Sequence, residues 1–159
     1  MAKPKKIMVA VEVWEDATLE LAKKAIAMAA PLCQPTAGTL MLVAVAPPPR
    51  PLVGFDISGE VQEVLMEIRD QELKLGEERL KELITHAESL DAKAEFELVD
   101  RPDLSVAKNL VDCAAREAVD VLVVTTHGHK GIKRALLGSV AAKVAHHSTR
   151  PVLLLPPDA

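Results

Sequence analysis

One segment of the chain combines residue types that bind anions: "TTHGHKGIKRALLGSVAAKV", residues 125–144. Gly138 and Ser139 stand where a helix is expected to begin, and a helix start presents unpaired backbone N–H groups and the positive end of its dipole. A glycine lets an anion approach the backbone closely. Ser139 could donate its hydroxyl proton to a phosphate oxygen or simply cap the helix. Lys130 and two further cations could neutralise a polyphosphate or form a solvated surface. Together these residues favour a phosphate site.

The same segment gives less support for catalysis. His127 and His129 could act as general acid or base near neutral pH, but no acidic residue is interleaved with them to hold Mg²⁺. The glycine spacing also matches neither the P-loop nor the dinucleotide-binding fingerprint. His146 and His147 are adjacent on a predicted helix and face different directions, which is poor geometry for a shared metal. We therefore expect no catalytic residue and no metal site.

The elements that position this segment alternate between strand and helix patterns. Short, mostly apolar runs predict strands at 5–13, 39–46, 93–99, 119–125 and 150–156. Helical spacing predicts helices at 16–32, 58–90, 104–118 and 138–148. This order predicts an α/β fold with an open parallel sheet of five strands and helices on both faces. Ligands of such sheets bind at the carboxyl ends of the strands, where the segment beginning at Thr125 lies.

Two local predictions concern the helices. Asp16 or Thr18 could cap the first helix. The long helix at 58–90 has apolar residues at helical spacing, and its charges fit a solvated face. Its predicted buried stripe comprises Val61, Val64, Leu65, Ile68, Leu73, Leu80, Leu83 and Ile84.

Composition excludes several classes of protein. The 159 residues are 49% hydrophobic and 26% charged, which fits a single globular domain spanning 1–159. The formal net charge of -4 argues against a general nucleic-acid or membrane-surface binder. No apolar stretch is long enough to cross a bilayer or form a signal-peptide core, so we expect a cytoplasmic protein. Cys33 and Cys113 lack disulfide or metal spacing and are interpreted as small buried hydrophobes.

The run from Gly128 through nine residues to Gly138-Ser139 resembles the nucleotide-binding signature of the universal stress proteins, G-x2-G-x9-G-(S/T). The similarity extends to "IMVAVE", "VDRPDLSVA", "DVLVVTTHG" and "KRALLGSVAAKVAHHSTRPVLLLP". The resemblance implies an adenine nucleotide alpha-hydrolase-like (Rossmann-like) sandwich with strand order 3-2-1-4-5. It also implies a homodimer, often joined through the last strand. Some members of the family bind ATP and others do not.

The resemblance assigns the phosphates and ribose to Gly128, Gly138 and Ser139, with the Val140 N–H beside them. It places the adenine against backbone groups at the end of the second strand. The full set of nucleotide-binding residues expected from it is Val11, Glu12, Val13, Val43, Val45, Thr125, Gly128, His129, Lys130, Gly138, Ser139 and Val140.

Three residues depart from the family pattern. Thr125 stands where the first signature glycine is expected, and its β-branched side chain takes space near the ribose or phosphate. Glu12 replaces the family's aspartate at the end of the first strand. Trp14 could stack on an adenine, fill the pocket and exclude one, or pack against a neighbouring helix.

Two functions therefore remain open. In one, the protein is a stress-response module that binds ATP, or ADP or AMP, with Mg²⁺ possible and slow hydrolysis at most, and the nucleotide changes its conformation and choice of protein partners. In the other, it is a nucleotide-free dimeric interaction protein whose pocket Thr125, Glu12 and Trp14 have closed. In either, the short last strand could pair with its counterpart across a two-fold axis. The loop at 47–59, with Leu52 and Phe55, is a candidate flap over the site.

Overall fold

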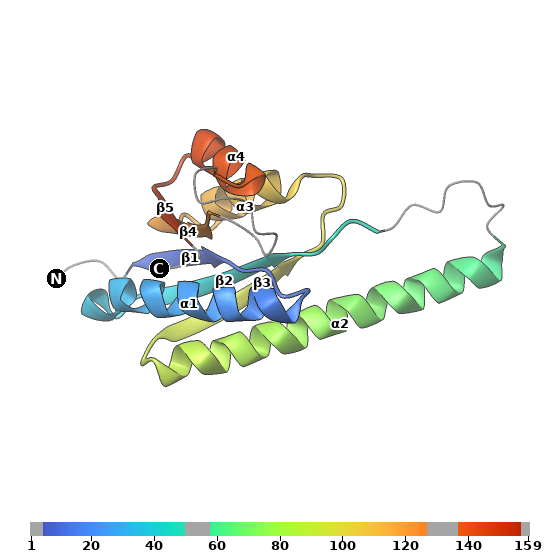
Figure 1. Ribbon diagram of the computed structural model, residues 1–159, viewed down its shortest axis with the longest axis horizontal. Coiled ribbons are helices and arrows are strands. Elements are labelled where there is room, and N and C mark those ends of the chain that lie inside the picture. The colour runs from blue at the N-terminus through green and yellow to red at the C-terminus, as the bar shows by residue number, and fades with distance from the viewer. Residues whose placement is uncertain (1–4, 50–57, 127–136, 157–159) are drawn as a thin grey trace.

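The computed structural model describes residues 5–49, 58–126 and 137–156. Within these ranges one parallel sheet has the order β3-β2-β1-β4-β5, which confirms the predicted fold (Figure 1). Its strands are β1 (Lys6–Ala10), β2 (Thr39–Val45), β3 (Lys93–Val99), β4 (Val121–Thr125) and β5 (Val152–Leu155). The helices are α1 (Asp16–Cys33), α2 (Gly59–Ser89), α3 (Val106–Arg116) and α4 (Ser139–His147), with a short 3-10 turn, η1 (Gln34–Thr36).

The sheet separates two layers of core. Successive residues of a strand point to opposite faces, so Val9 packs toward α1 and α2 while Met8 packs toward α3 and α4. Both side chains are fully buried, as are Leu42 and Leu122 on the neighbouring strands. Burial on both faces explains why the central strands are continuous apolar runs rather than alternating ones.

The chain leaves β1 earlier than predicted. The strand ends at Ala10, and one further ladder bond follows, in which the Val11 N–H donates to the Val43 carbonyl at 2.9 Å. Neither Asp16 nor Thr18 is the N-cap of α1, because the extended residue at that position is Glu15. Thr18 instead donates its hydroxyl proton to the Glu15 carbonyl at 2.7 Å.

The predicted buried stripe of α2 is wrong for its first half. The buried residues of α2 are Gly76, Leu80, Leu83 and Ala87, all in the second half. The reason is length, because the 31-residue helix extends beyond the sheet and its first half projects from the domain (Figure 1). Val61, Val64 and Ile68 are consequently 41%, 54% and 50% exposed.

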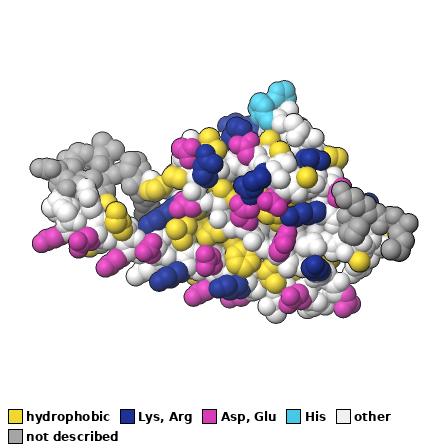
Figure 2. Space-filling view, turned by 180° about the vertical axis from the view of Figure 1, so that it is seen from behind, with side chains coloured by type: hydrophobic (Ala, Val, Ile, Leu, Met, Phe, Trp, Pro, Cys, Tyr) yellow, Lys and Arg dark blue, Asp and Glu magenta, His cyan; other side chains and the backbone are white. Residues whose placement is uncertain are grey.

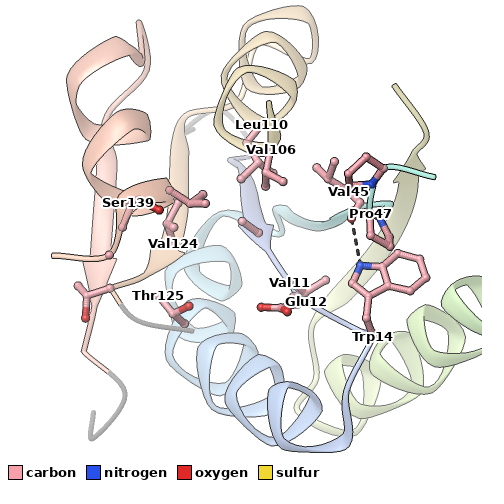
Figure 3. Close-up of a pocket in the computed structure, with 16 residues that line it drawn as sticks. Val11, Glu12, Trp14, Val45, Pro47, Val106, Leu110, Val124, Thr125 and Ser139 are labelled. Atoms are coloured by element: carbon pink, nitrogen blue, oxygen red, sulfur yellow. Dashed lines mark hydrogen bonds between the residues drawn. The ribbon is translucent and has the colours of Figure 1, made fainter. Parts of the chain in front are cut away.

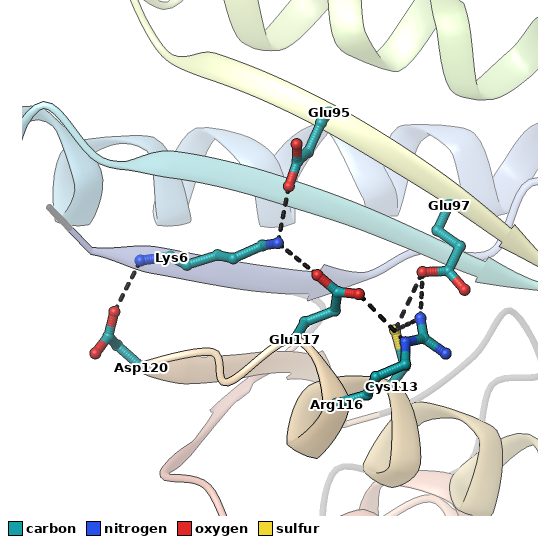
Figure 4. Close-up of polar contacts among 7 residues, drawn as sticks. All are labelled: Lys6, Glu95, Glu97, Cys113, Arg116, Glu117 and Asp120. Carbon is teal, nitrogen blue, oxygen red and sulfur yellow. Dashed lines mark hydrogen bonds and ion pairs between the residues drawn. The ribbon is translucent and has the colours of Figure 1, made fainter.

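A network of charged side chains ties the end of α3 to the sheet, near the edge where β1 begins (Figure 4). The Lys6 ammonium donates to Glu117 at 2.7 Å and pairs with Glu95 at 3.0 Å, and the Lys6 backbone N–H donates to Asp120 at 2.8 Å. The hydrogen bond from Lys6 lowers the pKa of Glu117, and that bond in turn raises the pKa of Lys6. Lys6, Glu95 and Glu117 therefore connect β1, β3 and the residue that follows α3.

The two cysteines are buried and free. Burial raises the pKa of the Cys113 thiol to about 11 and raises that of Cys33, so both thiols are protonated at neutral pH. This supports their interpretation as small hydrophobic side chains. In the described part of the chain, no helix combines the length and apolar character that a membrane crossing requires.

The strand order also fixes where a ligand can enter. From β1 the sheet continues to β2 on one side and to β4 on the other, so strand order reverses at β1. Connections that leave the carboxyl ends of β1 and β4 diverge toward opposite faces, which opens a crevice at that edge of an α/β sheet. The segment predicted to bind anions follows β4 at this crevice.

Candidate functional site

A pocket of about 460 Å³ occupies the crevice at the carboxyl ends of β1, β2 and β4 (Figure 3). Ser139 and Thr125 lie on one side of it, and Trp14, Val45 and Pro47 lie on the other. The floor, the α3 wall and the remaining lining come from Ala10, Val11, Glu12, Pro48, Val106, Leu110, Val124, Thr126, Gly138, Val140 and Ala141. The pocket thus has two unlike ends.

The first end is built by the start of α4. Gly138 is the N-cap, with extended φ and ψ of -57° and 152°, and its N–H donates to the Thr126 carbonyl at 2.7 Å. This bond ties the helix start to the end of β4. Ser139, Val140 and Ala141 follow and line the pocket, and the N–H groups of a first helical turn have no acceptor within their helix. Backbone donors, the positive end of the helix dipole and the Ser139 hydroxyl therefore meet here, as an anion requires.

The second end is apolar and contains the chain's single tryptophan. The Trp14 indole N–H donates to the Val45 carbonyl at 3.0 Å, so Trp14 is fixed against the end of β2 (Figure 3). Its ring packs on α2 at Gly76, where an added Cβ would lie 2.6 Å and 2.9 Å from two ring carbons. Of the three roles considered for Trp14, packing against a helix is the one observed, and the residue also lines the pocket.

Glu12 lines the pocket between these ends, and Thr125 lines it on the side of Ser139 (Figure 3). Glu12 is exposed, and Thr125 is the half-buried last residue of β4. Neither they nor Trp14 fill the space, because a pocket of about 460 Å³ remains with all three side chains on its surface. Closure by these three side chains is therefore not what the structure shows.

Two residues predicted at the site lie outside the pocket lining. Val13 is fully buried in the core, and its carbonyl accepts a hydrogen bond from Arg79 at 2.7 Å. Val43 is also fully buried, and its carbonyl is used by the Val11 N–H in the ladder between β1 and β2. The physical reason for Val43 is that the chain leaving β1 is still paired with it, so along β2 the pocket lining begins at Val45, beyond that pairing.

Other predicted residues fall outside the described part of the chain. Gly128, His129 and Lys130 belong to this group, as does His127, and their roles stay predictions. The same holds for most of the candidate flap at 47–59, including Leu52 and Phe55.

Sequence reasoning missed the α3 wall and part of the β2 end. Val106 and Leu110 are four residues apart in α3 and so lie on one helical face, toward the pocket (Figure 3). The sequence signal for the start of this wall is Ser105, a residue type that caps helices. Its hydroxyl accepts a hydrogen bond from the Lys108 N–H at 3.2 Å, so α3 begins at Val106. Pro47 and Pro48, which follow β2, were also missed.

The arrangement suits an elongated ligand with a flat apolar part and an anionic part. The start of α4 supplies donors for the anion, while Val45, Leu110 and Trp14 supply apolar surface for a ring. Glu12 is the carboxylate in the described lining, and no cluster of three or more metal-ligating side chains occurs among the described residues.

Comparison with known proteins agrees with this geometry. The model of the Universal stress protein family matches residues 3–156. A universal stress protein of Methanocaldococcus jannaschii is 32% identical over 105 residues, which span 66% of this chain but only 58% of that protein.

Two solved structures have the same fold and contain nucleotides. The universal stress protein from Archaeoglobus fulgidus in complex with dAMP superposes with a TM-score of 0.63 at 19% identity, covering 94% of this chain and 96% of that one. A universal stress protein in complex with cAMP gives a TM-score of 0.60 at 22% identity, covering 98% and 99% of the two chains.

Proposed function

Because the chain belongs to the universal stress protein family, we propose that its pocket binds ATP or a related adenine nucleotide, ADP or AMP. The bound nucleotide biases the conformation of a stress-response protein and its choice of protein partners. We propose no catalytic role beyond slow hydrolysis, and a cytoplasmic location.

The observation that carries this proposal is the start of α4 at one end of an otherwise apolar pocket. The phosphates lie against the first backbone N–H groups of α4 and the Ser139 hydroxyl. The base lies across the pocket, between Leu110 of α3 and the Val45 and Trp14 wall. Solved relatives in complex with dAMP and cAMP support an adenine nucleotide as the ligand class.

Mg²⁺ would bind through the phosphates of a triphosphate and a carboxylate, since this ion keeps oxygen ligands and several waters. Glu12, exposed at the pocket, is the side chain that could contribute from the described residues. A monophosphate would need no metal there. The relative affinities for ATP, ADP and AMP with and without Mg²⁺ therefore report how far the phosphates extend from α4.

The test is isothermal titration of nucleotide-stripped protein with these three ligands. Gly138→Val places a side chain where the anion approaches, and the φ and ψ of Gly138 are accessible to valine. Gly59→Val is the matched control, because an added Cβ at this helix start meets nothing within 4 Å. We expect saturable binding that Gly138→Val abolishes and Gly59→Val leaves unchanged. Absence of binding in the wild-type chain would reject the proposal.

One observation favours the second candidate, a nucleotide-free interaction protein. The Trp14 indole N–H already occupies the Val45 carbonyl, a backbone acceptor that a base could otherwise use. If the ultraviolet absorbance ratio of the protein is the same before and after nucleotide stripping, and no nucleotide binds, this candidate replaces the first.

We also propose a homodimer through β5. The strand has β4 as its one partner in the described sheet, and Leu153 at its centre is 36% exposed. Pairing with a second β5 across a two-fold axis would cover Leu153 and satisfy the open backbone edge. Leu153→Lys should convert the dimer to a monomer in light scattering, whereas a Leu153→Val variant should stay dimeric. A wild-type monomer would contradict this interface.

A further inference from the structure

The projecting half of α2, residues 59–75, is called the α2 arm below. It extends past the sheet, and the buried residues of α2 begin only at Gly76 (Figure 1). Hydrophobic side chains lie among acidic ones on this arm (Figure 2). Val64 is 54% exposed and Ile68 50% exposed, which is unusual for side chains of this size on one short helical segment.

Four of the five exposed large apolar residues of the arm form one stripe, and the fifth, Met66, which is 68% exposed, lies on the opposite side of the helix. Val61, Val64, Ile68 and Leu75 occupy successive a and d positions of a heptad, with Gln71 at the remaining one. The stripe runs about 21 Å along the helix, at 1.5 Å per residue. At 100° per residue, it lies about 100° around the helix from the buried face of Gly76 and Leu80. It is therefore a second face of α2 and not an extension of the core.

Charged residues flank this stripe in a self-complementary way. Glu67 and Lys74 both occupy the g position, on the same edge of the stripe, and both are exposed. Neither has an ion-pair partner among the described residues. In an antiparallel helix pair, g positions face g positions of the partner helix.

We propose that the α2 arm binds the α2 arm of a second copy of this chain in an antiparallel pair. In the register that fits, Val64 packs on the partner's Leu75 and Ile68 lies beside the partner's Gln71. Glu67 then faces the partner's Lys74, and two-fold symmetry repeats this ion pair.

Other arrangements of two arms are less favourable. A parallel pair would bring Glu67 against the partner's Glu72, since g positions then face e positions. An antiparallel pair shifted by one heptad would bring Glu67 against the partner's Glu67. The charges thus select both the direction and the register of the pair.

The association is expected to be weak. A stable interface buries about 800 Å² on each partner, and a stripe of four apolar side chains on one helix provides less than that. The arms therefore pair reversibly at high protein concentration. Because this contact is separate from β5, it would join β5 dimers into larger assemblies, or monomers into dimers if β5 is unpaired.

The experiment is sedimentation velocity of the full chain over a range of concentrations and at two ionic strengths. Glu67→Lys or Lys74→Glu each turns two attractive pairs into two repulsive ones and should weaken the association about 4-fold to 30-fold. The double swap, Glu67→Lys with Lys74→Glu, should restore it. Glu63→Lys is the matched control, because Glu63 is exposed on the same arm away from the stripe.

Each outcome is informative whether or not β5 pairs, since the swaps leave β5 unchanged. The proposal is supported if the association is weakened in both single variants, is recovered in the double variant and is unchanged in Glu63→Lys. Three results would overturn it: no concentration-dependent step in the wild type, no recovery in the double variant, or an equal loss in Glu63→Lys. Circular dichroism of each variant checks that the helix content is unchanged.

Discussion

The contact between Trp14 and Gly76 predicts that the effect of one substitution changes sign with its background. The substitution is Gly76→Ala. Replacing a glycine inside a helix with alanine normally stabilises a protein by about 1 kcal/mol, because alanine has the higher helix propensity. Here the new Cβ would lie 2.6 Å from one carbon of the Trp14 ring and 2.9 Å from another, closer than atoms in contact can be. The indole must move away.

The magnitude follows from three contributions. Overpacking costs about 1–3 kcal/mol, and losing the bond between the Trp14 indole N–H and the Val45 carbonyl costs about 0.5–1.5 kcal/mol. The gain in helix propensity offsets about 1 kcal/mol of this. The clashing atoms are at the far end of a side chain, which favours the lower part of the range, so we expect a net loss of about 1–2 kcal/mol.

The matched experiment repeats the substitution in a Trp14→Leu background. Leucine does not reach Gly76, so the same change to alanine should now stabilise the protein by up to about 1 kcal/mol. Urea unfolding followed by circular dichroism measures all four proteins, since the Trp14→Leu chains contain no tryptophan or tyrosine. An equal effect of Gly76→Ala in both backgrounds, within about 0.5 kcal/mol, would refute the reasoning.

Three further predictions concern the rest of the molecule. Lys6→Met should lower the free energy of unfolding at pH 7 by about 0.2–1 kcal/mol. Because the pKa of Glu117 is lowered in the folded state, this difference should shrink as the pH falls below 4.5, the ordinary pKa of a glutamate, when stability is measured over a range of acid pH. Cys113, with a thiol pKa of about 11, should react with a thiol reagent at pH 8 only after unfolding, and fast reaction of the native protein would contradict its burial. Ser139→Ala should weaken AMP binding about 5-fold to 10-fold by calorimetry through loss of one hydroxyl donor, whereas an unchanged affinity would assign Ser139 to the helix alone.

The fold could be predicted because its strands are buried on both faces. Continuous apolar runs such as 39–46 and 119–125 are too short for typical helices, and their alternation with helical periods leaves a parallel sheet as the arrangement that buries them. The position of the pocket followed from the same order, since β4 ends where the sheet order reverses.

The α2 stripe could not be assigned from periodicity alone. Apolar spacing shows that Val64 and Ile68 share a face with each other, but it does not show how far the sheet extends beneath the helix. The strands facing α2 are at most seven residues long, whereas α2 has 31 residues. The excess of helix length over strand length is what exposes the arm.

The apolar end of the site depended on contacts between distant parts of the chain. Trp14 and Gly76 are 62 residues apart, and a lone glycine within a charged helix gives no sign that an indole covers it. Of the two predicted β2 residues, Val43 is still paired with the chain leaving β1 and only Val45 lines the pocket, a difference of one pleat that strand propensity does not resolve.

The central claim is that an adenine nucleotide binds between α4 and the Trp14 wall, and the protein contains its own probe for it. Trp14 is the only tryptophan, no tyrosine is present, and the indole lines the pocket, so fluorescence excited at the tryptophan band reports on this site alone. Titration with AMP should change the emission saturably in the wild-type chain and not in Gly138→Val. Emission that stays constant in the wild type, or that changes equally in Gly138→Val, would contradict the account.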